Sequence, residues 1–147
     1  MTDQYDNDNP EHREIRLGIE IGDGISNMEK VEVALKAMKA AGFEMEHHED
    51  LADREDEDAA PWYWPLSGQL KYIQTLGDIP TIMRMTKIGR GFVHRFVGAL
   101  ETVGVAPKGT QKTADSLALA ADCLVAGGKQ KLFTPMYLMV GRKPANA

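Results

Sequence analysis

The chain of 147 residues has one cysteine, few aromatic residues and no long hydrophobic run. The single cysteine, Cys123, excludes a disulfide framework and a cysteine-based zinc cluster, and it fits a reducing compartment. No uninterrupted apolar stretch approaches the roughly 20 residues that a membrane-spanning helix needs. The acidic, polar first residues do not resemble a signal peptide or a transit peptide. The length and the 43% of hydrophobic residues predict one globular domain rather than a disordered chain.

Charge is distributed unevenly along the chain. Residues 1–60 carry 18 Asp and Glu against 6 Lys and Arg, whereas residues 61–147 carry 4 against 11. Such a composition shift predicts a boundary near Pro61, with each half in a different environment. The overall pI of 5.3 and the lack of aromatic residues among the basic ones argue against nucleic acid as a partner.

Local signals in the first part predict an αβ unit. Residues 9–11 (Asn-Pro-Glu) are typical of a helix start, although the apolar residues between 15 and 21 alternate as in a strand. The Ser-x-x-Glu pattern at 26–29 predicts a capping box and a helix that ends before Gly42. Residues 43–48 alternate between apolar and polar and predict a strand. Helix, glycine and strand in this order are typical of a sheet covered by helices.

The second part is predicted to be mostly helical. We expect a short helix over about 67–76, a long helix over about 78–103, a further helix over about 112–126 and a final strand over 136–142. A helical wheel of the long helix separates an apolar half from a basic half. The apolar half holds Ile82, Met85, Ile88, Phe92, Val93, Phe96, Val97, Leu100 and Val103. The basic half holds Arg84, Lys87, Arg90, His94, Arg95 and Glu101, with Met83 as the exception. Burying nine apolar side chains outweighs the attraction of a few cations to an anionic surface, so the apolar half is predicted to face the core.

Several familiar motifs are missing from the sequence. The segment 22–27 lacks the third glycine of a dinucleotide-binding fingerprint, and no P-loop is present. His47 and His48 are neighbours on a predicted strand, so they point to opposite faces and cannot both bind one metal ion. We predict no metal ligands and no cofactor-binding residues in this chain.

Three consecutive aromatic residues, Trp62, Tyr63 and Trp64, stand between two prolines. This arrangement makes a rigid apolar wall that suits a flat hydrophobic ligand or a cation. The alternative is a loop whose aromatic side chains only attach it to the core. The pattern by itself leaves both interpretations open.

Several blocks of sequence follow one another in the order seen in one known family. They are residues 1–6 (MTDQYD), 9–13 (NPEHR), 19–25 (IEIGDGI), 33–36, 42–44, 49–52, 61–66 (PWYWPL), 105–109 (VAPKG) and 127–136 (GGKQKLFTPM). With them, the chain resembles the C-terminal portion of the sterol 24-C-methyltransferases over essentially its whole length. It departs from the family pattern at Ser26, where proline is usual, and at Trp64, where tyrosine is commoner.

The resemblance implies a fold and a domain division. The expected fold is α/β, the C-terminal part of a class I S-adenosylmethionine-dependent methyltransferase with a mostly helical insertion before the last strand. Residues 1–60 are expected to be the C-terminal remnant of the methyltransferase domain. Residues 61–147 are expected to form the sterol methyltransferase C-terminal domain.

The resemblance also implies a reaction, the transfer of a methyl group from S-adenosylmethionine to carbon 24 of a sterol side-chain alkene in sterol biosynthesis. An alkene has no proton to remove before attack, so the site needs aromatic faces and carboxylates for a carbocation rather than an activated nucleophile. The expected substrate-binding residues are Trp62, Tyr63 and Trp64. The expected catalytic residues are Tyr5, Glu20 and Asp23, and the final base is left open among them.

In this family the glycine-rich segment that binds the methyl donor precedes the first residue of this chain. We therefore expect a fragment that is inactive alone, with S-adenosylmethionine bound mainly by a segment outside it. The alternative is a non-catalytic sterol- or membrane-binding module. The expected partners are a sterol, further copies of the chain in a homo-oligomer, and a membrane contacted peripherally. The membrane would be the cytoplasmic face of the endoplasmic reticulum or of lipid droplets.

Overall fold

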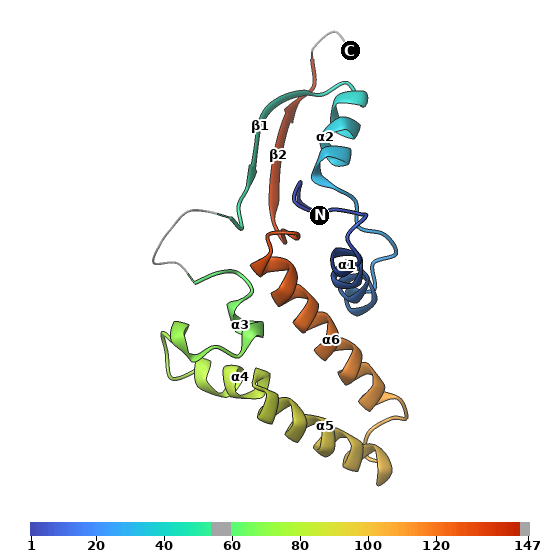
Figure 1. Cartoon of the computed structure of the whole chain (residues 1–147), viewed down its shortest axis with the longest axis vertical. Helices are drawn as coiled ribbons and strands as arrows, with labels where there is room; N and C mark the ends of the chain where they lie inside the picture. Colours follow the sequence, from blue (N-terminus) through green and yellow to red (C-terminus); the bar gives the residue numbers. More distant parts are fainter. Residues whose placement is uncertain (54–59, 145–147) are drawn as a thin grey trace.

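The computed structural model describes residues 1–53 and 60–144, which form helices and a two-stranded ribbon. The elements are α1 (Pro10–Asp23), α2 (Val31–Ala40), β1 (Glu44–Asp50), α3 (Trp64–Ser67), a 3-10 turn (Leu70–Tyr72), α4 (Asp78–Met85), α5 (Lys87–Thr102), α6 (Thr110–Lys129) and β2 (Tyr137–Arg142). Figure 1 shows the ribbon and α2 at one end of the long axis, α4 and α5 at the other, and α6 between them. The prediction of a mixed helix and strand chain is confirmed. In the described part of the chain, no helix is both long and apolar enough to cross a membrane.

Helix α1 begins where the sequence predicts. The Asn9 side chain accepts a hydrogen bond from the Glu11 amide at 3.0 Å, and Pro10 occupies the first turn. Gly24 ends the helix in the left-handed conformation, with φ of 67°. The strand-like alternation at 15–21 is therefore misleading, because a complete set of helix-end signals encloses it.

The predicted capping box at Ser26 is wrong, since α2 begins only at Val31. The Met28 amide donates instead to the Glu20 carboxylate on α1, at 2.8 Å. The Met28 amide is therefore bound by a side chain of α1, and no local helix cap forms at this point of the chain. The predicted end is confirmed, because Gly42 has a φ of 86° directly after the helix.

Both predicted strands are present and pair antiparallel. Asp50 lies opposite Tyr137 and Glu44 lies opposite Arg142, with a bulge between Met45 and His47. The two strands are the whole sheet of the described residues. This arrangement is compatible with the C-terminal part of a methyltransferase.

The predicted long helix over 78–103 is two helices that meet at Thr86. The Thr86 hydroxyl accepts from the Gly89 amide at 3.1 Å and donates to the Met83 carbonyl at 2.7 Å, so it caps α5 while it closes α4. A β-carbon on Gly89 would lie 2.0 Å from the Met83 carbonyl oxygen. The break between α4 and α5 therefore requires glycine at position 89. The spacing of the apolar residues gives no indication of this break. Ser67, expected to start a helix, ends α3 instead.

The prediction that the apolar half faces the core holds only in part for α5, where Val93, Val97 and Leu100 are half-buried. Ile88, Phe92, Phe96 and Val103 are exposed by 87%, 70%, 55% and 70%. Of the basic half, Arg90 and His94 contact α6, and Arg90 binds Asp122 at 2.6 Å, whereas Arg84, Lys87 and Arg95 are exposed. His94 likewise contacts Asp115 at 2.7 Å.

The core lies between α1 and α6. Ile15, Ile19 and Cys123 are buried there together with Leu132. Glycines on α1 let the two helices approach closely, since a β-carbon on Gly22 would lie 1.9 Å from the β-carbon of Ala120. This contact fixes the position of α6, and α6 supplies part of the lining of both cavities described below.

Candidate functional site

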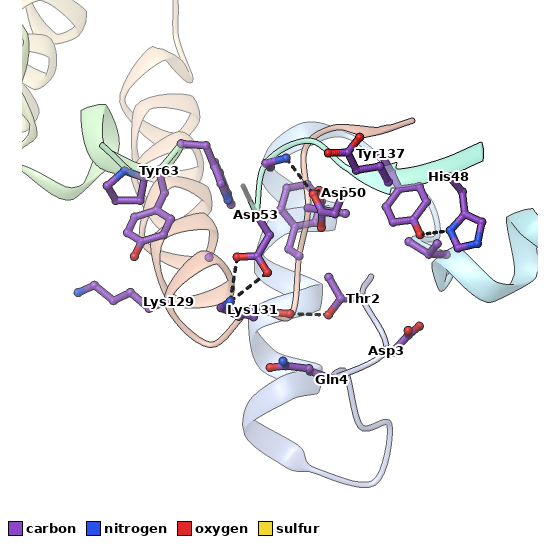
Figure 2. A pocket seen from close by; sticks show the side chains of 18 residues that line it. Thr2, Asp3, Gln4, His48, Asp50, Asp53, Tyr63, Lys129, Lys131 and Tyr137 are labelled. Carbon is purple, nitrogen blue, oxygen red and sulfur yellow. Dashed lines mark hydrogen bonds and ion pairs between the residues drawn. The ribbon is translucent and has the colours of Figure 1, made fainter. Parts of the chain in front are cut away.

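A cavity of about 550 Å³ lies where the end of β1, the segment before α3 and the C-terminal end of α6 meet (Figure 2). Trp62, Tyr63 and Phe133 form its aromatic wall. Polar side chains that include Asp50 and Asp53 line the rest. The volume lies within the range of small-molecule sites, and the combination of aromatic surface with a few polar groups is typical of them.

The aromatic wall is built by a turn. The Trp64 amide donates to the Pro61 carbonyl at 2.8 Å, which bends the chain at the aromatic run. Trp62 then packs edge to face on Tyr63, with ring centroids 5.5 Å apart, and on Phe133 at 5.7 Å. The three rings therefore hold one another in place as a rigid surface.

Gly128 on α6 makes room for this wall. A β-carbon there would lie 2.2 Å from the Tyr63 ring and 3.0 Å from the Trp62 ring. Both aromatic rings therefore reach the helix backbone only because residue 128 has no side chain.

The polar side of the cavity is organised by hydrogen bonds. Asp50 accepts from the Thr134 hydroxyl at 2.6 Å and from the Ala52 amide at 2.9 Å. Asp53 forms an ion pair with Lys131 at 2.9 Å. Two carboxylates are thus held within the lining of the cavity that Trp62 and Tyr63 also line.

Tyr137 contributes a neutral polar group. Its hydroxyl lies 3.0 Å from Nδ1 of His48. Burial, and then the nearby charges of Asp3 and Asp50, raise the pKa of the Tyr137 phenol above its ordinary value. The hydroxyl therefore stays protonated at neutral pH and can donate a hydrogen bond.

A second cavity, of about 630 Å³, lies between α4, α5 and α6. Its walls are mainly apolar and include Met85, Val93, Leu117 and Leu124. Asp23, at the end of α1, also lines it. This cavity suits an apolar body with few polar groups.

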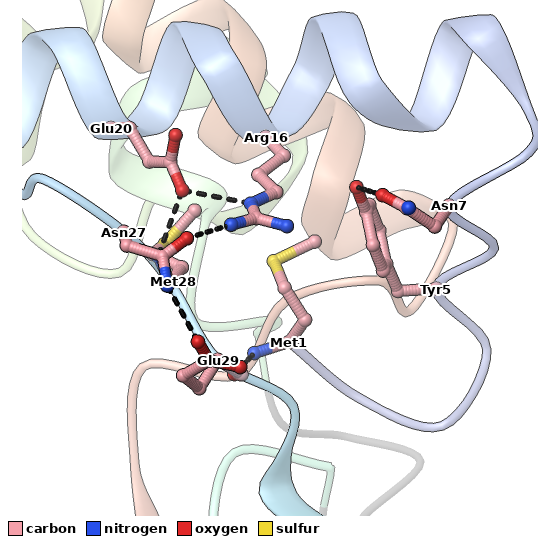
Figure 3. Close-up of polar contacts among 8 residues, drawn as sticks. All are labelled: Met1, Tyr5, Asn7, Arg16, Glu20, Asn27, Met28 and Glu29. Atoms are coloured by element: carbon pink, nitrogen blue, oxygen red, sulfur yellow. Dashed lines mark hydrogen bonds and ion pairs between the residues drawn. The ribbon is translucent and has the colours of Figure 1, made fainter. Parts of the chain in front are cut away.

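Two of the three predicted catalytic residues lie together outside both cavities (Figure 3). Tyr5 is buried, and its hydroxyl lies 3.2 Å from the Asn7 side-chain oxygen. Arg16 joins it to Glu20, because the guanidinium lies 5.7 Å from the Tyr5 ring centre and 2.8 Å from the Glu20 carboxylate.

Glu20 is held as an anion. Desolvation pushes its pKa upward, but the hydrogen bonds from Arg16 and from the Met28 amide outweigh it, so the pKa lies below its ordinary value. In this structure Glu20 ties α1 to the segment that leads into α2. Asp23, the third predicted residue, lines the second cavity instead.

Of the predicted substrate-binding residues, Trp62 and Tyr63 line the first cavity and Trp64 does not. Trp64 packs against Tyr72, with ring centroids 6.3 Å apart, and its indole N–H donates to the Gln69 carbonyl at 3.1 Å. The aromatic run therefore has two parts, one at the cavity and one that anchors the segment after α3.

The lone thiol belongs to the core. Burial, followed by the charges of Asp122 and Glu14, raises the pKa of Cys123 above its ordinary value. A β-carbon on Gly18 would lie 2.2 Å from the Cys123 sulfur, so the thiol fills the α1–α6 contact. Among residues 1–53 and 60–144, no three His, Cys, Asp or Glu side chains come together as metal ligands.

Several cavity residues were missed by the sequence reading. They are Asp50, Gly128, Lys131, Phe133 and Tyr137. Two blocks of the family resemblance, 49–52 and 127–136, contain four of the five. The signal was present as sequence similarity, whereas no local pattern shows that these blocks meet residues 61–63.

Comparisons with known proteins agree with the resemblance. Residues 80–145 match a family model described as sterol methyltransferase C-terminal. Sterol 24-C-methyltransferases of Aspergillus fumigatus and Gibberella zeae are both 70% identical, over 144 and 145 residues, which are 98% and 99% of this chain. That of Saccharomyces cerevisiae is 52% identical over the whole chain. No solved structure matches significantly.

The chain spans 38% of the length of each of these three relatives, and the match falls in their C-terminal part. A sequence identity of this level over nearly the whole chain shows a family relationship and not only a shared fold. The chain belongs to the sterol 24-C-methyltransferase family.

Proposed function

We propose that the chain is the sterol-binding, C-terminal segment of an enzyme that methylates carbon 24 of a sterol side chain with S-adenosylmethionine. The observation that carries this proposal is the cavity in which Trp62, Tyr63 and Phe133 lie opposite Asp50 and Asp53. Such a lining suits a substrate that is apolar before the reaction and carries positive charge during it.

The chemistry explains why these residue types are needed. The two π electrons of the alkene form the new bond to the methyl carbon while the bond from that carbon to the donor's sulfonium sulfur breaks, which leaves a neutral thioether. The neighbouring alkene carbon becomes a tertiary cation. Loss of a proton to a base then restores a double bond. Aromatic faces stabilise the cation without reacting with it, and a desolvated contact of this kind contributes about 2 kcal/mol. Water must be kept out, because it would trap the cation.

We assign the cation to the Trp62 and Tyr63 faces. The carboxylate of Asp50 adds negative charge to the cavity lining, whereas the charge of Asp53 is offset by its ion pair with Lys131. Trp64, expected as a third wall residue, contacts Tyr72 instead, so its role in substrate binding stays a prediction.

Tyr5, Glu20 and Asp23 stay predicted catalytic residues. Of the three, Asp23 alone lines one of the two cavities. Tyr5 and Glu20 are engaged with Arg16, an arrangement that suits positioning better than proton transfer.

The glycine pair at the end of α1 does not suit the methyl donor. The glycine pair at 22 and 24 lies at the C-terminal end of α1, where backbone carbonyls rather than amides are left without helical partners. Such a helix end does not attract the carboxylate of S-adenosylmethionine. We therefore expect the donor to be held mainly outside residues 1–147, and the isolated chain to transfer no methyl group.

A chimera tests the proposal. Residues 1–147 would replace the matched C-terminal part of the Saccharomyces cerevisiae relative, and methyl transfer to a sterol would be measured. We expect activity, and a roughly thirtyfold loss of turnover in Trp62→Ala with little change in donor affinity, since 2 kcal/mol corresponds to this factor. Trp64→Ala is the matched control, with a smaller expected loss. A folded chimera without activity, or equal turnover after Trp62→Ala, would contradict the proposal.

A non-catalytic sterol-binding module is the second candidate. The apolar second cavity between α4, α5 and α6 favours it, because a ligand could be held there without the charged groups of the first cavity. Sterol binding by the isolated chain combined with an inactive chimera would support this candidate over the enzyme.

The remaining expectations from the resemblance belong to the whole protein. They are peripheral contact with the endoplasmic reticulum or lipid droplets, and assembly into a homo-oligomer. Localisation of the tagged protein and its mass in solution test the two separately.

A further inference from the structure

The end of the molecule formed by α4 and α5 combines exposed apolar side chains with basic ones. Ile88, Phe92 and Phe96 on α5, and Val103 directly after it, are mostly exposed. We call these four residues the α5 outer face. Phe92 and Phe96 stack in parallel, with ring centroids 6.2 Å apart, so the face presents a continuous apolar ridge.

We propose that the α5 outer face is a docking surface for an anionic lipid bilayer. The proposal gives a surface to the membrane contact named in the proposed function, on which it rests, but it does not depend on methyl transfer. In this orientation α5 lies flat at the interface, with its apolar residues between the headgroups and the acyl chains.

Charge is what selects the bilayer. Lys87 and Arg95 of α5 are exposed, as is Arg84 of α4 at the edge of the second cavity. The two acidic residues of 78–103 lie near the ends of this segment, where Asp78 accepts from the Thr75 amide and Glu101 from the Gly109 amide, and four Lys and Arg outnumber them. Basic residues beside an apolar helix face are the combination that binds anionic lipid surfaces.

The charge split of the sequence is also a split in space. The four acidic residues of β1 lie at the end of the long axis opposite to α4 and α5, whereas α2 beside them carries one Glu and two Lys (Figure 1). An anionic surface would therefore attract the α4–α5 end more strongly than β1, which favours an orientation with the outer face toward the lipid.

A second copy of the chain fits this surface less well. In a two-fold dimer the same surface meets itself, so the basic side chains of both copies would come together. Like charges in contact disfavour such a dimer, whereas lipid phosphates would neutralise them.

Vesicle binding of the 147-residue chain tests the proposal. The probe is a sterol-free vesicle of phosphatidylcholine with about a third phosphatidylserine, so that sterol recognition cannot contribute. We expect Phe92→Ser with Phe96→Ser to weaken partitioning at least tenfold, and pure phosphatidylcholine to weaken it severalfold.

Leu17→Ser with Ile21→Ser is the matched control. These residues have the same spacing on α1 and similar exposure, 55% and 57%, and they should change partitioning less than twofold. Circular dichroism melting checks that both double variants stay folded. No vesicle binding by the unaltered chain, or equal losses in both double variants, would overturn the proposal. Self-association abolished by the phenylalanine substitutions, without vesicle binding, would also overturn it. Intact sterol binding in either case would leave the proposed function standing.

Discussion

Helix α6 contacts α1 on one side and α5 on the other, and the two contacts differ in chemistry. Toward α1 the contact is made of glycine, alanine and buried isoleucine, with a β-carbon excluded at Gly22. Toward α5 the specific contacts are charged, between Arg90 and Asp122 and between His94 and Asp115. The first contact depends on shape and the second on charge, so α1 is fixed by packing while α5 leaves its apolar side free.

The largest expected effect comes from truncating the same residue type in the two contacts. Ile19 is fully buried between α1 and α6, whereas Ile88 is 87% exposed on α5. Ile19→Ala should lower the free energy of unfolding by about 2–5 kcal/mol, and Ile88→Ala by no more than about 0.5 kcal/mol. Urea denaturation measures both. Similar losses in the two variants would mean that α5 buries its apolar face in solution.

The next prediction concerns glycine-to-alanine substitutions, whose effect on stability should have opposite signs at the two contacts. Gly22→Ala places a methyl group 1.9 Å from the Ala120 β-carbon and should destabilise by about 1–3 kcal/mol. Gly91→Ala on α5 meets nothing within 4 Å and should stabilise by about 0.5–1 kcal/mol, because alanine loses less backbone entropy in a helix. Thermal melting of the two variants shows the sign directly. Destabilisation by both would contradict the free surface of α5.

A smaller effect depends on pH and belongs to the α1 side. The folded pKa of Glu20 lies below its ordinary value of 4.5, so its carboxylate stabilises the fold above the unfolded pKa. This contribution is lost as the pH falls through the folded pKa. Glu20→Gln should therefore be less stable than the unaltered chain at pH 7, and the gap should narrow as the pH falls below 4.5 and close below the folded pKa. Glu32→Gln, at an exposed pair with Lys36, is the control and should show almost no gap at either pH.

The smallest effect is expected at the charged contact itself. The Arg90–Asp122 pair is partly exposed, and pairs of this kind contribute about 0–1 kcal/mol. Asp122→Asn should therefore lower stability by less than about 1 kcal/mol, with a loss that shrinks in 0.5 M salt. Chemical denaturation at two salt concentrations checks it. A loss above 2 kcal/mol would show that charge holds α5 as firmly as packing holds α1.

Much of the secondary structure followed from local signals. Asn9 and Pro10 start α1, Gly42 follows α2, and both strands lie where alternation predicts them. These signals act within a few residues, so the sequence contains them directly. The capping box at Ser26 failed because Glu20, from another element, competes for the Met28 amide.

The side of α5 that packs against α6 could not be predicted. A helical wheel shows which half of a helix is apolar, but it does not show which half contacts a neighbouring helix. Asp115 and Asp122 on α6 decide it, and they are more than ten residues away in sequence. The candidate site shows the same limit. Trp62 and Tyr63 were identified because they are consecutive aromatic residues. The packing of Trp62 on Phe133, 71 residues later, could be seen only in the tertiary structure.

The single thiol at the α1–α6 contact provides a reporter for the opening of that contact. Cys123 is nearly fully buried, and its raised pKa keeps the thiolate scarce, so a thiol reagent can react only when the helices separate. Because the chain has no other cysteine, every labelled molecule records one such opening. At high reagent concentration, the rate of labelling at Cys123 would then equal the rate at which the contact between α1 and α6 opens.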